Sequence, residues 1–124
     1  MFVVIVGGGK VGSHVARLLL EEGHDVRVID NRQDILHKLH RELPAEVIHD
    51  GDGTDPLRLE QTGIRRAQVL AAVTGNDETN LVACSLARDE FKVPRIIARV
   101  NDPRNKWLFT PEMGVDVSIN QADL

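Results

Sequence analysis

The chain has 124 residues, of which 42% are hydrophobic and 27% charged, as is typical of one soluble globular domain. It carries 15 lysines and arginines against 19 acidic residues, and this net charge of −4 argues against a sequence-independent nucleic-acid binder, which needs a basic face. The longest apolar stretch, residues 1–6, is far shorter than the ~20 residues of a membrane span and has no basic segment before it, so neither direct membrane insertion nor a signal peptide is expected.

Short apolar or β-branched runs recur along the chain and predict strands. The first, residues 2–6, is apolar throughout, as expected of a strand that is buried on both faces of its sheet. In chain order, the predicted strands are residues 2–6, 26–29, 46–49, 69–73, 95–100 and 115–119.

Helical patterns fill the intervals between these runs. From residue 11, apolar side chains recur at i, i+4, i+7 and i+8, which predicts a helix with one apolar face. Asn31 is expected to cap the second helix, which Pro44 closes. Asp55 and Asp102 are each followed by proline, a typical helix start, and a long helix is expected over about residues 77–91.

The strict alternation of strand and helix implies parallel strands joined by right-handed crossovers. The most economical arrangement is an α/β, Rossmann-like, doubly wound six-stranded parallel sheet in the order 3-2-1-4-5-6, with helices on both faces. Residues 1–124 contain no linker, low-complexity tract or block of like charge, so we expect them to form one domain.

A glycine-rich loop, Gly7-Gly8-Gly9-Lys10-Val11-Gly12, matches the G-x-G-x-x-G pattern of nucleotide-binding turns. It follows a predicted buried strand and opens a helix, the context that this pattern requires. Gly7 would permit the tight turn, Gly9 would let the backbone approach a pyrophosphate, and Gly12 would let the helix pack on the strand. Free N–H groups at the helix start attract anions, and Lys10, next to Val11, either reaches the phosphates or lies in solvent.

An acidic residue stands where the same pattern expects one, since Asp30 ends the second predicted strand 18 residues after Gly12. A carboxylate in this place accepts hydrogen bonds from the hydroxyls of an adenosine ribose, and its charge disfavours the 2′-phosphate of NADP. The alternative role for Asp30 is a helix cap. Asn31 and Arg32 follow it and are assigned to the same predicted site, with Arg32 either beside the adenine or in solvent.

Two further loops are expected at the carboxyl end of the sheet. Asp52 and Gly53 follow the third strand and would border the adenine, while Thr74 and Gly75 follow the fourth and would face the phosphates or a second nucleoside. The run from residue 50 superficially resembles a calcium loop, but Asp55 stands where that loop needs glycine. We therefore predict cofactor-binding residues and neither a metal site nor a catalytic residue.

Six segments carry a family resemblance: GGGKVG at 7–12, VID at 28–30, GDGTD at 51–55, AAVTGNDETNLVAC at 71–84, IIARVNDP at 96–103 and MGVDVSIN at 113–120. Across them the chain resembles the N-terminal lobe of RCK domains (regulators of potassium conductance), and more closely the regulatory proteins of Trk/Ktr-type potassium uptake systems. The resemblance implies a cytoplasmic lobe, peripheral to a membrane transporter, that binds NAD(H) or ATP/ADP and gates potassium transport. It also implies homodimers and a higher ring, for which the crossover helix and C-terminal lobe that normally follow are absent from these residues.

Other function classes remain open at this point, namely the cofactor domain of an NAD-dependent oxidoreductase and a stand-alone redox sensor. The chain has no tyrosine, which single-domain tyrosine-dependent reductases need, and its six strands leave no residues for a substrate domain, so we expect no enzyme activity. With one cysteine, Cys84, no internal disulfide can form, and a reducing cytoplasm is the simplest compartment. The apolar helix 81–86 together with residues 107–109 predicts a homodimer surface.

Overall fold

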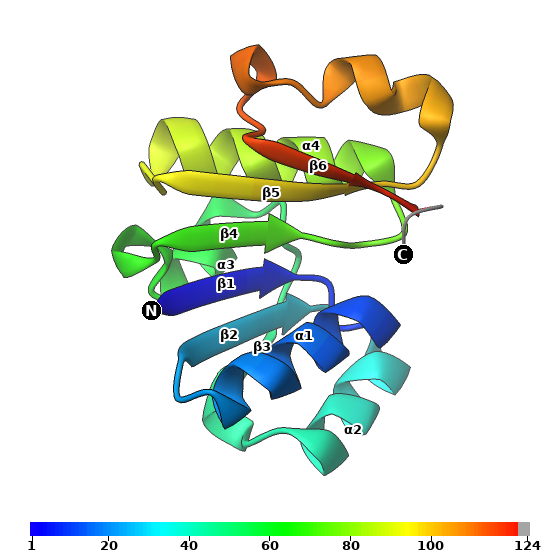
Figure 1. Cartoon of the computed structure of the whole chain (residues 1–124). Coiled ribbons are helices and arrows are strands. Elements are labelled where there is room, and N and C mark those ends of the chain that lie inside the picture. Colours follow the sequence, from blue (N-terminus) through cyan, green and yellow to red (C-terminus); the bar gives the residue numbers. More distant parts are fainter. Residues whose placement is uncertain (122–124) are drawn as a thin grey trace.

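Six strands pair in parallel in the order β3-β2-β1-β4-β5-β6 in the computed structural model, which describes residues 1–121 (Figure 1). This confirms the predicted doubly wound α/β fold. The strands are β1 (Phe2–Val6), β2 (Asp25–Asp30), β3 (Ile48–Asp50), β4 (Val69–Ala72), β5 (Arg95–Val100) and β6 (Val117–Asn120). The α-helices are α1 (Lys10–Glu21), α2 (Gln33–Glu42), α3 (Pro56–Gln61) and α4 (Asp77–Ser85), with the π-helical turn η3 (Leu86–Glu90) and the 3₁₀ turns η1 (Ala45–Val47), η2 (Ile64–Arg66), η4 (Pro103–Leu108) and η5 (Pro111–Met113).

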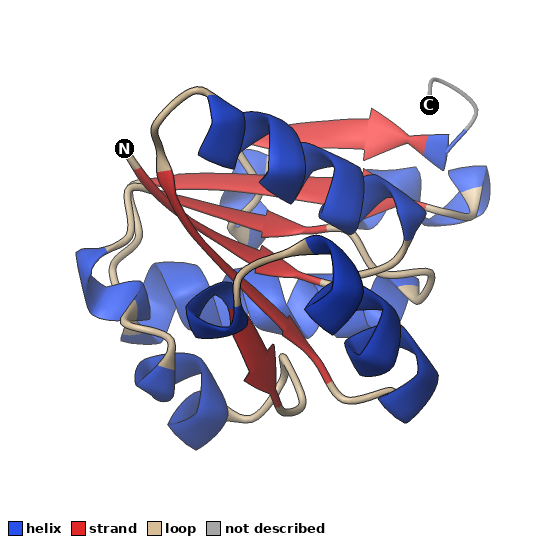
Figure 2. Ribbon diagram, turned by 90° about the horizontal axis from the view of Figure 1, so that it is seen from below, coloured by secondary structure: helices blue, strands red, loops and turns tan. Residues whose placement is uncertain are grey.

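Two apolar cores lie on opposite faces of this sheet, with helices on both sides in Figure 2. Strand β1 is buried along its whole length and supplies both cores, because its side chains alternate between the faces. Val3 and Ile5 pack with α1 and α2, whereas Val4 and Val6 pack with α3 and α4. The prediction that the apolar run 2–6 forms a strand buried on both faces of the sheet is therefore confirmed.

Two strands begin two residues later than predicted. Residues 45–47 form the 3₁₀ turn η1, in which Val47 N–H donates to Pro44, so β3 begins only at Ile48. The last strand begins at Val117 rather than at residue 115, because Val115 N–H donates to Thr110 and fixes the preceding residues in a turn. In both places a local turn takes the backbone donor that a strand ladder would use.

The expected cap at Asn31 is also wrong. Helix α2 begins after Arg32 with no side-chain cap, because the carboxylate of Asp30 accepts the Arg32 N–H instead. The caps predicted at Asp55 and Asp102 are confirmed, since their carboxylates accept Leu57 N–H and Arg104 N–H, although the second opens the 3₁₀ turn η4 rather than an α-helix. The long helix is present as α4 continued by η3.

The surface predicted for dimer contact is smaller than expected. Phe109 is only 5% exposed and belongs to the core, and Leu81, Leu86 and Leu108 are partly buried against it. Trp107 is 74% exposed and Val82 of α4 is partly so. Among the described residues, no helix is both long and apolar enough to cross a membrane.

Candidate functional site

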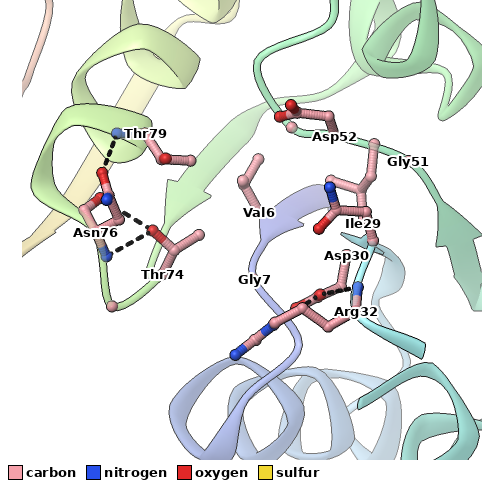
Figure 3. A pocket seen from close by; sticks show the side chains of 13 residues that line it. Val6, Gly7, Ile29, Asp30, Arg32, Gly51, Asp52, Thr74, Asn76 and Thr79 are labelled. Carbon is pink, nitrogen blue, oxygen red and sulfur yellow. Dashed lines mark hydrogen bonds and ion pairs between the residues drawn. The ribbon is translucent and has the colours of Figure 1, made fainter. Parts of the chain in front are cut away.

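A cavity of about 330 Å³ opens at the carboxyl ends of β1, β2 and β4, at the point where the strand order reverses (Figure 3). Ligands of open parallel sheets bind at such a switch point. The cavity is lined by Val6, Gly7, Ile29, Asp30, Asn31, Arg32, Gly51, Asp52, Gly53, Thr74, Gly75, Asn76 and Thr79. Eight of these residues were assigned to a nucleotide from the sequence: Gly7, Asp30, Asn31, Arg32, Asp52, Gly53, Thr74 and Gly75.

The turn after β1 has a shape that only glycine permits at two positions. Gly7 has a φ of +108°, in the left-handed region, and an added Cβ would lie 3.0 Å from the Thr74 side chain. A Cβ at Gly12 would fall directly on the carbonyl oxygen of Gly7. Helix α1 can therefore start immediately behind β1 only because position 12 has no side chain.

The other glycine-loop residues lie beside the cavity rather than in its lining. Gly9 is the N-cap of α1, and the nearest atom to a Cβ added there is Arg32 Nη2, at 3.7 Å. The space next to Gly9 is therefore open, as the approach of a phosphate to its backbone requires. Lys10 and Val11 line a separate groove with Lys38 of α2, so the structure does not bring these two residues to the cavity.

The carboxylate of Asp30 lies at the end of β2, is only 5% exposed and accepts four hydrogen bonds. Gly8 N–H donates to Oδ2 at 2.9 Å and Arg32 N–H to Oδ1 at 3.0 Å. The Arg32 side chain supplies the others, from Nε to Oδ1 at 3.0 Å and from Nη2 to Oδ2 at 2.7 Å. Burial by itself raises the pKa of Asp30, but these hydrogen bonds outweigh it and the pKa is lowered. The carboxylate is therefore held ionised in the cavity wall.

The loop after β3 closes the same side of the cavity. Asp52 Oδ1 accepts Thr54 N–H at 2.8 Å and the Thr54 hydroxyl at 2.7 Å, which fixes the turn, and Gly51 N–H donates to the Asp30 carbonyl. A Cβ at Gly53 would overlap the side chain of Val6. This glycine lets the loop lie directly against the end of β1.

Across the cavity, a buried amide holds the loop after β4. The Asn80 side chain is fully buried in α4, and its Oδ1 accepts the Thr74 N–H at 3.0 Å and the Thr74 hydroxyl at 2.6 Å. Its Nδ2 donates to the carbonyls of Thr74 and Arg99. Asn76 caps α4 by accepting Thr79 N–H. Asn80 is not among the residues predicted to bind the ligand, although a polar residue inside an apolar helix is a visible signal of a role at this loop.

A second carboxylate links this loop to the segment after β5. Asp77 accepts hydrogen bonds from Asn101 N–H at 2.6 Å, Asp102 N–H at 2.9 Å and Asn105 Nδ2 at 2.9 Å. Burial raises the pKa of Asp77, but these bonds outweigh it and the pKa is lowered. Asn101 Nδ2 also donates to the Thr74 carbonyl, so the cavity rim and η4 share one network.

The arrangement suits a ligand with both anionic and hydroxyl groups. The start of α1 offers backbone N–H groups beside glycines, and Asp30 offers acceptors on the other side of the turn. Among residues 1–121, no three histidine, cysteine, aspartate or glutamate side chains gather as metal ligands would. Cys84 is fully buried in the core, and this burial raises the pKa of its thiol to about 12.

Known proteins are similar to this chain in sequence and in fold. The chain is 47% identical over 116 residues to a Trk system potassium uptake protein TrkA homolog of Methanothermobacter thermautotrophicus, covering 94% of this chain and 52% of the relative. It is 42% identical over 120 residues to the Trk system potassium uptake protein TrkA of Mycobacterium tuberculosis, covering 97% and 54%. The chain thus spans about half the length of these relatives.

Several solved structures have the same fold as this chain. The GsuK channel bound to NAD matches with a TM-score of 0.80 and 27% identity, over 98% of this chain and 21% of that one. GsuK bound to ADP matches equally well, over 30% of its length. The TrkA-N domain of the inner membrane protein ybaL from Escherichia coli has a TM-score of 0.83 at 20% identity, covering 98% and 87%, and supports the fold alone. The family model of the TrkA-N domain matches residues 3–121, and the chain therefore belongs to the TrkA-N domain family.

Proposed function

We propose that this domain is a nucleotide-sensing regulatory module that binds NAD(H) or ATP/ADP and gates a potassium channel or transporter. It would act from the cytoplasm, peripheral to the membrane transport subunit, as a homodimer or within a larger ring that needs further segments. The observation that carries the proposal is the ionised Asp30 carboxylate beside a glycine turn at the switch point. The GsuK structures with NAD and ADP support it.

Different residues of the site would contact different parts of the nucleotide. The backbone at Gly7 and Gly9 would meet the phosphates at the α1 N-terminus, where the helix dipole favours negative charge. Val11, whose side chain lines the neighbouring groove, would contribute only its backbone N–H. Asp30 would accept the ribose hydroxyls, and Asp52 and Gly53 would border the adenine. Of the remaining assigned residues, Asn31 and Arg32 lie beside Asp30, and Thr74 and Gly75 lie across the cavity. Gly12 would serve the phosphate site through the close packing of α1 on β1, and Lys10 would have to extend its side chain from the neighbouring groove.

Binding energy in such a module shifts an equilibrium between two conformations rather than driving a reaction. A ligand can shift that equilibrium only by its difference in affinity for the two states. The shared network of Thr74, Asp77 and Asn101 supports a route from the cavity rim to η4. Nucleotide at the rim would change the position of η4, where Trp107 is exposed.

The thermal midpoint of unfolding across NADH, NAD, NADPH, ATP, ADP and AMP tests the binding. Nucleotide at a hundredfold excess over its Kd should stabilise the fold by ~2.7 kcal/mol. We expect a clear shift with NADH or ATP/ADP and little with NADPH, because Asp30 would repel a 2′-phosphate. Gly9→Val should abolish the shift and still fold, since its side chain would enter open space near Arg32 Nη2.

A larger shift with NADPH than with NADH would contradict the role of Asp30. An unchanged shift in Gly9→Val would place the ligand elsewhere. The same preparations, incubated with NADH and a panel of carbonyl substrates, test the alternative of a dehydrogenase domain. Saturable oxidation of NADH that disappears in Gly9→Val would favour an enzyme over a regulator.

A further inference from the structure

The predicted ribose acceptor is already occupied by a side chain of the same loop. Asp30 has about four acceptor positions as a carboxylate, and all four are used. Two bonds come from the backbone N–H groups of Gly8 and Arg32. The other two come from the side chain of Arg32, which lines the cavity beside Asp30.

The same guanidinium also reaches the glycine turn. Arg32 Nη2 is the atom nearest to a Cβ built on Gly9, at 3.7 Å. Figure 3 shows the Arg32 side chain running along Asp30 toward the Gly7 turn. It therefore lies between the group that would bind the ribose and the backbone that would bind the phosphates.

We propose that Arg32 is a displaceable latch on the nucleotide site. Resting on the proposed function, the step is an exchange in which two ribose hydroxyls replace Arg32 Nε and Nη2 on the Asp30 carboxylate. The number of hydrogen bonds to Asp30 is conserved, because two O–H donors take the place of two N–H donors. The backbone bonds from Gly8 and Arg32 stay and keep the carboxylate oriented during the exchange.

The ion pair is suited to being displaced. The Arg32 side chain is 53% exposed, so water can solvate the guanidinium as it leaves, whereas the Asp30 side chain is 5% exposed and depends on a replacement partner. Arg32 thus lowers nucleotide affinity without blocking the site permanently. Nucleotide binding and release of Arg32 would occur together.

A second ion pair with the same local geometry lies outside the site and serves as a control for the role of Arg32. Asp102 and Arg104 have the same spacing and bonds, from Arg104 N–H to Oδ1 at 3.0 Å and from Nη2 to Oδ2 at 2.8 Å. This pair lies outside the cavity lining, and its Asp102 side chain is 37% exposed. Arg104→Met therefore changes charge and side-chain volume as Arg32→Met does, away from the site.

The test compares adenosine, which is neutral and has no phosphate, with ADP, both titrated calorimetrically into wild type, Arg32→Met and Arg104→Met. Removing this ion pair, in which only the arginine is exposed, should tighten binding of both ligands about two- to fivefold in Arg32→Met. Arg104→Met should match wild type. Adenosine binding to wild type should also tighten with added salt, which screens the latch, while Arg32→Met should show no such dependence. Arg32→Gln serves if the methionine variant fails to fold.

Weaker ADP binding with unchanged adenosine binding in Arg32→Met would make Arg32 a phosphate ligand and overturn the latch. Equal affinities in wild type and Arg32→Met would also overturn it. In both cases wild type still binds nucleotide, so the proposed function stands. If neither adenosine nor ADP binds any variant, the latch fails, and the proposed function fails with it only if wild type also does not bind NADH.

Discussion

The β1–β2 side of the cavity is shaped by glycines and one carboxylate, whereas on the β4–α4 side one neutral, buried amide, that of Asn80, holds the loop that lines the cavity. On the first side, Gly7 and Gly12 shape the backbone and Asp30 offers acceptors whose arginine partner is exposed. On the second, Asn80 has no exposed surface and its bonds fix the Thr74 loop. Ligand exchange is easy where partners are solvated and costly where they are buried. Substitutions on the first side should therefore change binding, and those on the second should change stability.

The largest expected effect is on stability and is an exception on the first side, because Gly12 is needed for the packing of α1 on β1. A Cβ at Gly12 would overlap the carbonyl oxygen of Gly7, so Gly12→Ala must displace α1 from β1. We expect a loss of about 3 kcal/mol in the free energy of unfolding, at the upper end of overpacking effects. Urea denaturation measures it. Gly75→Ala is the matched control, since no atom lies within 4 Å of its added Cβ, and equal losses in both variants would contradict the prediction.

Asn80→Ala tests the amide side directly. The change leaves the Thr74 and Arg99 backbone groups without their buried partner. We expect the free energy of unfolding to fall by about 2–3 kcal/mol, measured by urea denaturation. The comparison variant Asn76→Ala removes only an exposed helix cap and should cost about 1 kcal/mol. An Asn80→Ala loss no larger than that of Asn76→Ala would show that the buried network is not what stabilises this side.

Asp30→Ala should weaken binding on the first side, besides leaving the buried Gly8 N–H without its acceptor. Loss of the charge-assisted acceptor for ribose should weaken ADP or NADH by about tenfold, roughly 1.5 kcal/mol. Isothermal titration measures the Kd. Asp102→Ala removes the carboxylate of the matched ion pair outside the cavity and should leave the Kd unchanged. An unchanged Kd in Asp30→Ala would contradict the role of Asp30 in ribose binding. Its role would then be structural, through its hydrogen bonds to the backbone N–H groups of Gly8 and Arg32.

The carboxylate of Asp77 gives the amide side a pH dependence. Its pKa is lowered in the fold, so it binds protons less readily than in the unfolded chain, and its stabilising effect is fully present above about pH 4 and lost as pH falls through the folded pKa. Asp77→Asn should therefore be less stable than wild type by about 1.5 kcal/mol at pH 7. Thermal unfolding from pH 7 to pH 3 should show the two proteins converge. A difference that is constant over this range would exclude an effect of ionisation.

The contrast between the two sides also explains what the sequence could predict. Strand order followed from the alternation of apolar runs and helices, and Gly7, Gly12 and Asp30 stand at the fixed spacing of a local motif. The amide network joins Asp77 to Asn101, 24 residues away, and no periodicity signals that contact. The third strand begins late for a local reason, since a turn hydrogen bond from Val47 N–H to Pro44 outweighs the β propensity of Val47.

The pairing of Arg32 with Asp30 is only partly predictable from the sequence. The sequence left Arg32 either beside the adenine or in solvent, and the side chain does neither fully, because it folds back onto a carboxylate two residues earlier. Asp102 and Arg104 repeat the pairing, which indicates that the spacing itself favours it. The spacing alone does not say which of the two pairs lies in a ligand site; the burial of Asp30 and its bond to Gly8 do.

The smallest expected effect concerns Lys10, which stands at the start of α1 but lines the groove toward α2 instead of the cavity. A flexible, exposed lysine could still reach the terminal phosphates of ATP, where solvent screens its charge. Lys10→Met should then weaken ATP about two- to threefold and leave adenosine unchanged, as measured by titration at fixed salt. Lys38→Met removes the same charge from the same groove and should affect neither ligand. If both variants weaken ATP equally, the effect is that of net charge at a distance, and the β1–β2 side then binds phosphate through its backbone alone.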